Sequence, residues 1–341
     1  MDNNNLPVAL DAMGGDGGIG VNVEGAVRAS DDLGIRVILV GDEKKLRDEL
    51  SKYKYDPEKI TVHHAKENIG MDESPAAAVR AKRDSSIAVA TQLVAQRKAG
   101  AVVSAGNSGA VMACSLMLMR RLPGITRPAI TTLMPTLTGA CIILDVGANV
   151  DSKPKNLLQF ALMGSTYVKD IFGIRSPRVG LLSIGEERNK GNELTLEAYD
   201  LISGTDLNFI GNIEGKDIPH GKADVVVCDG FTGNIVLKFG EGVAEMLFKL
   251  IKLELKKHPL AFLSIPFLWG ALKDLRKRID YSEYGGAPLL GIDGVCIICH
   301  GISNSKAIKN ALRAANEFVK KGINKKISGE MEKYRMEGNN E

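Results

Sequence analysis

Five apolar runs of this chain each end in a glycine-rich loop that carries Asp, Asn or Ser, and a helix is expected after each loop. The segments are VALDAMGGDGG (8–18), AVVSAGNSGA (101–110), CIILDVGAN (141–149), VGLLSIGEERNKGNEL (179–194) and DVVVCDGFTGN (224–234). Continuous apolar strands are typical of parallel sheets buried on both faces. Their carboxyl ends share one edge, where ligands bind, so the loops are expected to converge on one cleft. Backbone N–H groups, small residues and helix N-termini there indicate a phosphate-sized anion.

Strand and helix patterns alternate along the whole chain, which predicts a three-layer α/β/α sandwich around a mostly parallel, doubly wound sheet. No linker or internal repeat divides the sequence, so residues 1–330 are expected to form a single catalytic domain. A helical hairpin over 235–280 is expected to protrude from it, and the polar tail, 331–341, is expected to fray. The predicted strands are 7–12, 35–42, 59–65, 101–104, 129–133, 140–146, 178–184, 207–211, 223–228 and 295–301.

The composition limits which kinds of partner and which cellular compartment can be expected for the chain. A formal net charge of +3, with 5% aromatic residues and one Trp, gives no reason to expect nucleic acid. The first residues lack the basic and apolar regions of a signal peptide, and no apolar stretch reaches the about 20 residues that span a bilayer. The chain is therefore expected to stay in the cytoplasm, and its five cysteines are not expected to form a disulfide framework.

A G-x-G-x-x-G pattern at 15–20 raises the possibility of a dinucleotide site. Asp42 ends the next predicted strand, where such sites carry the acid that binds ribose. Asp11 and Asp16 argue against this interpretation, because their carboxylates would flank the pyrophosphate. Glycines needed only for a tight turn explain the same pattern. An NAD-dependent dehydrogenase therefore stays open as an alternative function.

The run Cys296-Ile297-Ile298-Cys299-His300 matches the C-x-x-C-H pattern of haem attachment. Alternate residues of a strand face opposite sides of the sheet, so these two thiols cannot attach one haem. We expect both cysteines in the core.

Acidic residues in the loops could hold Mg²⁺, but capping of helices and turns is the favoured interpretation, and neither a metal nor a cofactor is expected. These residues are Asp11, Asp16, Asp145, Asp151 and Asp229.

Two loops offer suitable surroundings for an anion. Asn107 or Ser108 can cap the helix that follows, leaving free N–H groups toward the cleft. Thr232, Gly233 and Asn234 can do the same for a long helix expected over 234–257.

Two further side chains could add charge or proton transfer. Lys190 is the loop cation best placed to meet a phosphate, and a solvated lysine is the alternative. His300 ends a predicted strand and could act as a general acid/base or orient a substrate.

The segment 258–279 has a different character, with aromatic and apolar residues beside a basic flank. Such a segment suits insertion at a lipid interface, and packing against a second copy of the chain is the alternative. The residues expected to contact membrane or carrier protein are Phe267, Leu268, Trp269, Lys273, Arg276, Lys277 and Arg278.

Seven motifs closely resemble, in the same order, those of the phosphate acyltransferases of bacterial phospholipid synthesis. They are DAMGGDG (11–17), SAGNSGA (104–110), DVGANVDSKP (145–154), GEERNKGNEL (185–194), CDGFTGNIVLK (228–238), YGGAPLLGIDG (284–294) and HGISNSKAIKNA (300–311). The resemblance implies a homodimeric α/β/α fold, similar in outline to phosphotransacetylases and isopropylmalate dehydrogenases. The chain departs from the family pattern at 17–20 and at Ile302, which replaces a serine.

The resemblance also implies a reaction: a fatty acyl group passes from acyl carrier protein to inorganic phosphate, giving acyl phosphate. An integral glycerol-3-phosphate acyltransferase would take up this product, which favours a place at the inner face of the membrane. A short-chain phosphotransacetylase and a membrane-associated scaffold stay open as alternatives. The residues of the chain themselves suggest a catalytic role for Lys190, Asn234 and His300. The residues implied to bind phosphate or the acyl group are Asp11, Gly14, Gly15, Asn107, Ser108, Gly109, Asn149, Asn192, Asp229, Gly230, Thr232, Gly233 and Ser303.

Overall fold

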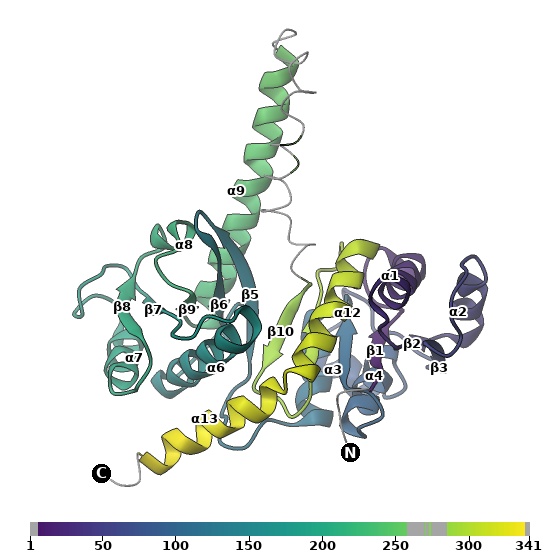
Figure 1. Ribbon diagram of the computed structural model, residues 1–341, viewed down its shortest axis with the longest axis horizontal. Coiled ribbons are helices and arrows are strands. Elements are labelled where there is room, and N and C mark those ends of the chain that lie inside the picture. Colours follow the sequence, from purple (N-terminus) through teal and green to yellow (C-terminus); the bar gives the residue numbers. More distant parts are fainter. Residues whose placement is uncertain (1–5, 258–269, 271–272, 274–284, 338–341) are drawn as a thin grey trace.

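The structure is a computed structural model that describes residues 6–257, 270, 273 and 285–337 (Figure 1). Its centre is an 11-stranded sheet in the order β3-β2-β1-β4-β11-β10-β5-β6-β9-β7-β8. The strands are β1 (Val8–Asp11), β2 (Val37–Gly41), β3 (Ile60–His64), β4 (Ala101–Ser104), β5 (Ala129–Thr136), β6 (Gly139–Leu144), β7 (Val179–Leu182), β8 (Phe209–Ile213), β9 (Val225–Val227), β10 (Ala287–Leu290) and β11 (Cys296–Ile298).

Helices cover both faces of this sheet, which confirms the predicted α/β class. The helices are α1 (Gly18–Leu33), α2 (Glu43–Leu50), α3 (Pro75–Ala81), α4 (Ser86–Ala95), α5 (Ser108–Cys114), α6 (Pro154–Phe172), α7 (Glu193–Ser203), α8 (Asp217–His220), α9 (Gly230–Lys257), α12 (Ser305–Lys320) and α13 (Ile323–Glu337). A π-helical turn over Ser115–Met119 extends α5.

The sheet consists of two parallel halves that run in opposite senses. Antiparallel strands β10 and β5 join them: β10 pairs with β11 through Ala287 and Pro288, and with β5 through Leu289 and Leu290. From Thr131 onward, β5 pairs with β6. This staggered register brings the carboxyl ends of β6 and β11 to the same level from opposite directions. The expectation that all carboxyl ends share one edge of a single parallel array is therefore wrong, although loops from both halves still meet.

Neighbouring residues of the central strands pack on opposite faces of the sheet. In β1, Ala9 belongs to the core cluster beneath α4, whereas Leu10 belongs to the cluster that includes residues of α1, α6 and α12. Cys296 and Cys299 are divided in the same way between these two clusters, as predicted. Burial raises the pKa of the Cys299 thiol to about 12, so this thiol is protonated at neutral pH.

The carboxyl-terminal region differs from the sequence expectation. Residues 331–337 were expected in a frayed polar tail, but they belong to helix α13. Ile327 and Met331 are buried, and α13 packs along α6. These two apolar residues, spaced four apart on one helix face, dock an otherwise polar segment on the core.

Helix α9 begins in the body of the protein and then projects away from it (Figure 1). Val236 and Leu237, near its start, pack against the core of the β6–β9 half. Apolar residues farther along α9 are exposed: Phe239, Met246, Leu247, Leu250, Ile251 and Leu253. Within the described residues, no helix is long and apolar enough to cross a membrane.

Most of the predicted hairpin beyond α9 lies outside the described residues. Gly270 and Lys273 are helical and exposed. The other predicted membrane or carrier contacts lie outside the described part: Phe267, Leu268, Trp269, Arg276, Lys277 and Arg278.

Candidate functional site

A cavity of about 290 Å³ lies where loops from the two halves of the sheet meet, and we refer to it as the central cavity. Four predicted site residues line it. Ser108 begins α5, Asn234 lies on α9, and His300 and Ser303 follow β11. The structure thus joins residues that lie up to 195 positions apart in the sequence (108 to 303).

The lining combines polar groups with an apolar surface. The polar and charged side chains are Ser108, Thr132, Asn234, Lys238, Glu241, His300 and Ser303. The larger apolar side chains are Ile130, Leu133, Val146, Leu237 and Ile298. Such a lining suits a substrate with both an anionic and an aliphatic part.

One face of α9 contributes a connected set of these residues. Leu237, Lys238 and Glu241 lie three, four and seven positions after Asn234, which places all four residues on one side of the helix. The Lys238 ammonium lies 2.9 Å from the Glu241 carboxylate. The central cavity is therefore lined along α9 by an amide, an apolar contact and an ion pair.

Asp229 sets the start of α9. Its carboxylate accepts hydrogen bonds from the Thr232 backbone N–H at 2.9 Å and from the Thr232 hydroxyl at 2.7 Å. This arrangement is an N-terminal cap, the role predicted for acidic loop residues. Both groups are therefore used in positioning α9, and neither lines the central cavity.

Asp145 organises the loop that follows β6. Its buried carboxylate accepts hydrogen bonds from the N–H groups of Ile130, Gly147, Ala148 and Asn149, and from the Asn149 side-chain amide. Burial raises the pKa of Asp145, and these donated hydrogen bonds oppose the rise. Asn149 also donates to the Pro128 carbonyl at 2.7 Å, so its amide holds the loop together and does not line the cavity.

Asp11 has a related position after β1. It is 3% exposed and accepts a hydrogen bond from Ser104, at the end of the neighbouring strand β4. Burial raises the pKa of Asp11, and hydrogen bonds from serine side chains and backbone N–H groups oppose the rise. Asp11 lies under the loops as a support and does not line the central cavity.

Asn107 caps α5, as predicted, by accepting from the Ala110 N–H at 3.1 Å. Its side-chain amide donates to carbonyls of the segment before α3, including Met71 at 3.1 Å and Glu73 at 3.0 Å. Both ends of the side chain are thus engaged, and Ser108 is the residue of this loop that reaches the cavity.

The predicted glycines permit close backbone packing around the site. At Gly233, a Cβ would lie 1.9 Å from the Asp145 carbonyl oxygen, so no side chain fits. A Cβ at Gly14 or Gly230 would also meet backbone atoms, at 2.7 and 2.6 Å. At Gly109 it would meet the Pro75 side chain at 2.6 Å, and Gly15 has a positive φ of 89°. These positions draw the loops together, and none of them lines the central cavity.

Lys190 and Asn192 lie in the loop that follows β7. Asn192 caps α7 by accepting from the Thr195 N–H at 3.0 Å. Lys190 is exposed and does not line the central cavity. Ser183 donates to the Lys190 carbonyl, which ties the loop to the end of β7.

The dinucleotide interpretation finds no support in the first loop. Asp42 caps α2 by accepting from the Lys45 N–H at 3.1 Å, which is a structural role for the expected ribose-binding acid. The Asp16 N–H donates to the Gly301 carbonyl at 2.8 Å, so this loop packs against the loop that carries His300.

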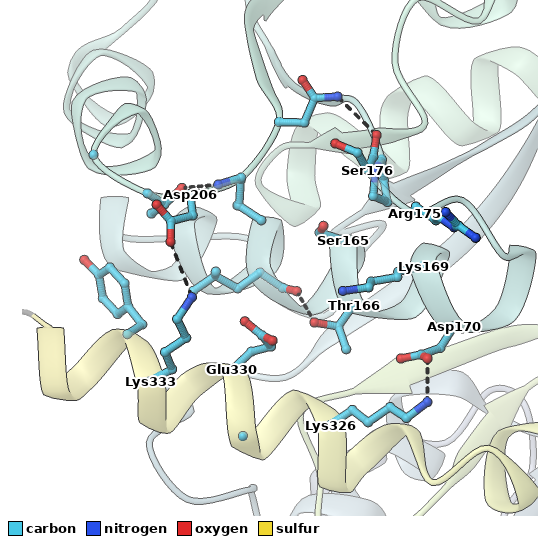
Figure 2. A pocket seen from close by; sticks show the side chains of 18 residues that line it. Ser165, Thr166, Lys169, Asp170, Arg175, Ser176, Asp206, Lys326, Glu330 and Lys333 are labelled. Atoms are coloured by element: carbon cyan, nitrogen blue, oxygen red, sulfur yellow. Dashed lines mark hydrogen bonds and ion pairs between the residues drawn. The ribbon is translucent and has the colours of Figure 1, made fainter.

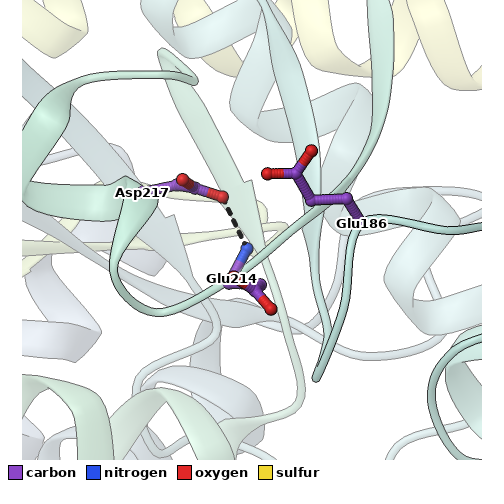
Figure 3. Close-up of side chains that lie close together, drawn as sticks. All are labelled: Glu186, Glu214 and Asp217. Atoms are coloured by element: carbon purple, nitrogen blue, oxygen red, sulfur yellow. Dashed lines mark hydrogen bonds between the residues drawn. The ribbon is translucent and has the colours of Figure 1, made fainter.

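A group of carboxylates outside the central cavity is paired with lysine side chains. Oxygen atoms of Glu186, Glu214 and Asp217 lie within 4.8 Å of one another (Figure 3). The Lys222 ammonium lies 2.9 Å from Glu186 and 3.4 Å from Asp217, and Lys216 pairs with Glu214. Lysine ammonium groups therefore already balance these carboxylates.

A larger cavity, of about 670 Å³, lies between α6, α13 and the loops before β7 and β8 (Figure 2). Ion pairs connect Lys326 with Asp170 and Lys333 with Asp206 across it. None of the predicted site residues lines it, so it is separate from the candidate site.

Sequence reasoning missed Lys238 and Glu241, as well as the contribution of β5 to the lining. One local signal was present: Lys238 lies four residues after Asn234 in an expected helix, so both were bound to share a face. Nothing local marked Ile130 or Leu133 as lining residues, because β5 reaches the cavity beside β10, a pairing partner about 160 residues later in the sequence.

Comparisons with known proteins address the fold and the family. A family model described as fatty acid synthesis protein matches residues 6–326. A phosphate acyltransferase of Endomicrobium trichonymphae is 55% identical over 320 residues, which cover 93% of this chain and 95% of that protein. A phosphate acyltransferase of Geobacter sulfurreducens is 52% identical over 327 residues, which cover 96% of this chain and 94% of that protein.

Solved structures with little sequence identity share the fold. A phosphotransacetylase of Streptococcus pyogenes aligns with a TM-score of 0.64 at 17% identity, covering 92% of this chain and 93% of that one. A putative 4-hydroxythreonine-4-phosphate dehydrogenase of Salmonella typhimurium aligns with a TM-score of 0.54 at 13% identity, covering 92% and 99%. These likenesses concern the fold alone and give the dehydrogenase alternative no separate support. The sequence matches, by their identity and extent, show that the chain belongs to the phosphate acyltransferases.

Proposed function

We propose that this protein transfers a fatty acyl group from the thioester of acyl carrier protein to inorganic phosphate. The observation that carries the proposal is the central cavity, where polar side chains and helix N-termini stand beside an apolar lining. Helix α12 begins at Ser305, just after Ser303, and its first N–H groups favour a bound anion. The apolar lining residues would contact the first part of the acyl chain.

In this mechanism phosphate is the nucleophile. A phosphate oxygen attacks the thioester carbonyl carbon, and the carbonyl oxygen becomes an oxyanion. The Asn234 amide would donate to that oxyanion. Collapse of the tetrahedral intermediate breaks the C–S bond, forms acyl phosphate and releases the carrier thiolate, which His300 would protonate. We also propose that Lys190, which does not line the cavity, contacts the phosphate.

The proposed partners follow from the donor and from α9. Acyl carrier protein is the proposed donor, and the basic residues Lys273, Arg276, Lys277 and Arg278 are its proposed contacts. The exposed apolar residues of α9 support a proposed homodimer, in which a second copy covers them. The segment beyond α9 is proposed to touch the inner face of the membrane, near an integral acyl phosphate:glycerol-3-phosphate acyltransferase.

Product formation tests the proposal. Purified protein is incubated with palmitoyl-acyl carrier protein, with and without inorganic phosphate, and acyl phosphate and free carrier thiol are measured. We expect acyl phosphate and free carrier thiol to form in equal amounts, and to form only when phosphate is present. Acetyl-CoA as a second donor tests for a short-chain phosphotransacetylase, and a thermal shift with NAD⁺ tests for a dehydrogenase. No phosphate-dependent product from the palmitoyl donor, with folded protein, would contradict the proposal.

A further inference from the structure

We propose that Lys238 binds the phosphate substrate and that Glu241 holds the Lys238 ammonium while phosphate is absent. This inference rests on the proposed function. Among the described residues that line the central cavity, Lys238 is the only lysine, and there is no arginine. The Lys238 ammonium is therefore the permanent positive charge that a phosphate anion meets when it enters the cavity.

The position of Lys238 suits this role. It lies one helical turn beyond Asn234 on the same face of α9, so both side chains reach the cavity from one rigid element. Phosphate held by Lys238 would thus lie beside the amide proposed to stabilise the oxyanion. The cap at Asp229 and the packing of Val236 and Leu237 hold this part of α9 against the body.

The ion pair with Glu241 is weak enough to exchange. The side chains of Lys238 and Glu241 are 53% and 40% exposed, and such solvated pairs contribute little to stability. A phosphate dianion carries more charge than one carboxylate and offers more acceptor oxygens. Phosphate can therefore replace Glu241 as the partner of the Lys238 ammonium. The Glu241 carboxylate, once unpaired, repels the phosphate unless the Glu241 side chain turns away. Neutralising Lys238 and neutralising Glu241 should therefore change the affinity for phosphate in opposite directions.

The experiment measures KM for phosphate and KM for the acyl donor separately. We expect Lys238→Gln to raise KM for phosphate by about 10- to 100-fold, the effect of losing a hydrogen bond to a charged group. Lys238→Arg keeps the charge and is expected to restore most of the affinity. Glu241→Gln is expected to lower KM for phosphate by about 2- to 5-fold. KM for the acyl donor is expected to change little in all three variants.

A second ion pair on α9 provides the matched control. Lys249 and Glu245 are paired at 2.5 Å but do not line the cavity. Lys249→Gln and Glu245→Gln are expected to leave both KM values unchanged.

Two outcomes would overturn the inference while leaving the proposed function intact. In one, Lys238→Gln keeps its KM for phosphate. In the other, Lys238→Gln raises only KM for the acyl donor, which would show that Lys238 contacts acyl carrier protein instead of phosphate. Wild-type protein without phosphate-dependent turnover would instead contradict the proposed function itself.

Discussion

The Ser104 hydroxyl donates a 2.7 Å hydrogen bond to the Asp11 carboxylate and thereby joins the carboxyl ends of two neighbouring parallel strands, β4 and β1. The same hydroxyl oxygen accepts the Gly106 N–H at 3.0 Å. One buried serine therefore links the support under the first loop to the backbone that leads to Ser108. We therefore expect the geometry of the central cavity to depend on this pair, although neither residue lines it.

Replacing Ser104 with Ala leaves the Asp11 carboxylate and the Gly106 N–H without this partner. We expect a loss of about 1 to 3 kcal/mol in the free energy of unfolding, measured by urea denaturation, and a lower kcat/KM because the Ser108 loop shifts. Thr91→Val is the control, since it removes a buried hydroxyl that bonds only within α4. Full activity in Ser104→Ala would contradict the proposed link to the cavity.

Replacing Asp229 with Ala removes the cap of α9. The expected cost is about 0.5 to 2 kcal/mol of unfolding free energy, with a fall in turnover because Asn234 and Lys238 lose their fixed position. Asp42→Ala removes a comparable cap from α2, which contributes no residue to the cavity lining, and is expected to leave turnover unchanged. Equal turnover in both variants would show that the start of α9 does not position the site.

Asn234→Ala and His300→Ala test the two proposed catalytic contacts. Loss of an oxyanion donor is expected to lower kcat by about 100- to 1000-fold, and loss of a general acid by about 100-fold or more. Circular dichroism and melting temperature establish that each variant is folded. Near-normal kcat in folded His300→Ala protein would remove His300 from the mechanism.

The pair Asp224–Arg178 predicts a pH-dependent contribution to stability. The Arg178 backbone N–H and guanidinium donate to Asp224 at 2.8 to 3.1 Å, just before the paired strands β9 and β7. Partial burial raises the pKa of Asp224, but the bonds from Arg178 outweigh it, and the net pKa lies below 3.8. The stabilisation is therefore present above pH 3.8 and is lost as pH falls through the lower folded-state pKa.

Asp224→Asn is accordingly expected to cost about 1 to 2 kcal/mol of unfolding free energy at pH 7. The difference from wild type is expected to shrink at pH 3 and below. Asp206→Asn, at an exposed ion pair with Lys333, serves as the control and is expected to have little effect at either pH. A difference that grows as the pH falls would contradict the assigned sign.

The segment beyond α9 predicts membrane binding that can be separated from catalysis. Replacing Phe267, Leu268 and Trp269 with Ser is expected to abolish flotation with anionic liposomes without loss of solubility. Turnover of dissolved acyl donor is expected to persist. Unchanged liposome binding would exclude these side chains as the membrane contact.

Much of the fold could be predicted from local pattern. Runs such as 101–104 are apolar without interruption, and a segment of that kind is stable only where both faces of a sheet are covered. Period-two alternation likewise placed Cys296 and Cys299 on opposite faces, as the structure confirms. The cap at Asn107 was also predictable, because a helix N-terminus needs acceptors close in sequence. The cap expected at Thr232, Gly233 or Asn234 was placed too late, because α9 begins at Gly230 and Asp229 caps it.

The arrangement of these elements depended on contacts between distant segments. Nothing within Ala287–Leu290 shows that this short strand runs antiparallel and joins two opposed halves, because its pairing partners lie on β5 and β11. For the same reason, the sequence pointed to Lys190 and did not single out Lys238, which lines the central cavity in the described part of the structure. Local propensity and apolar period specify which elements form, since those forces act between near neighbours. Which residues line the central cavity was decided only by strand register and helix packing, because these bring together residues that are distant in the sequence.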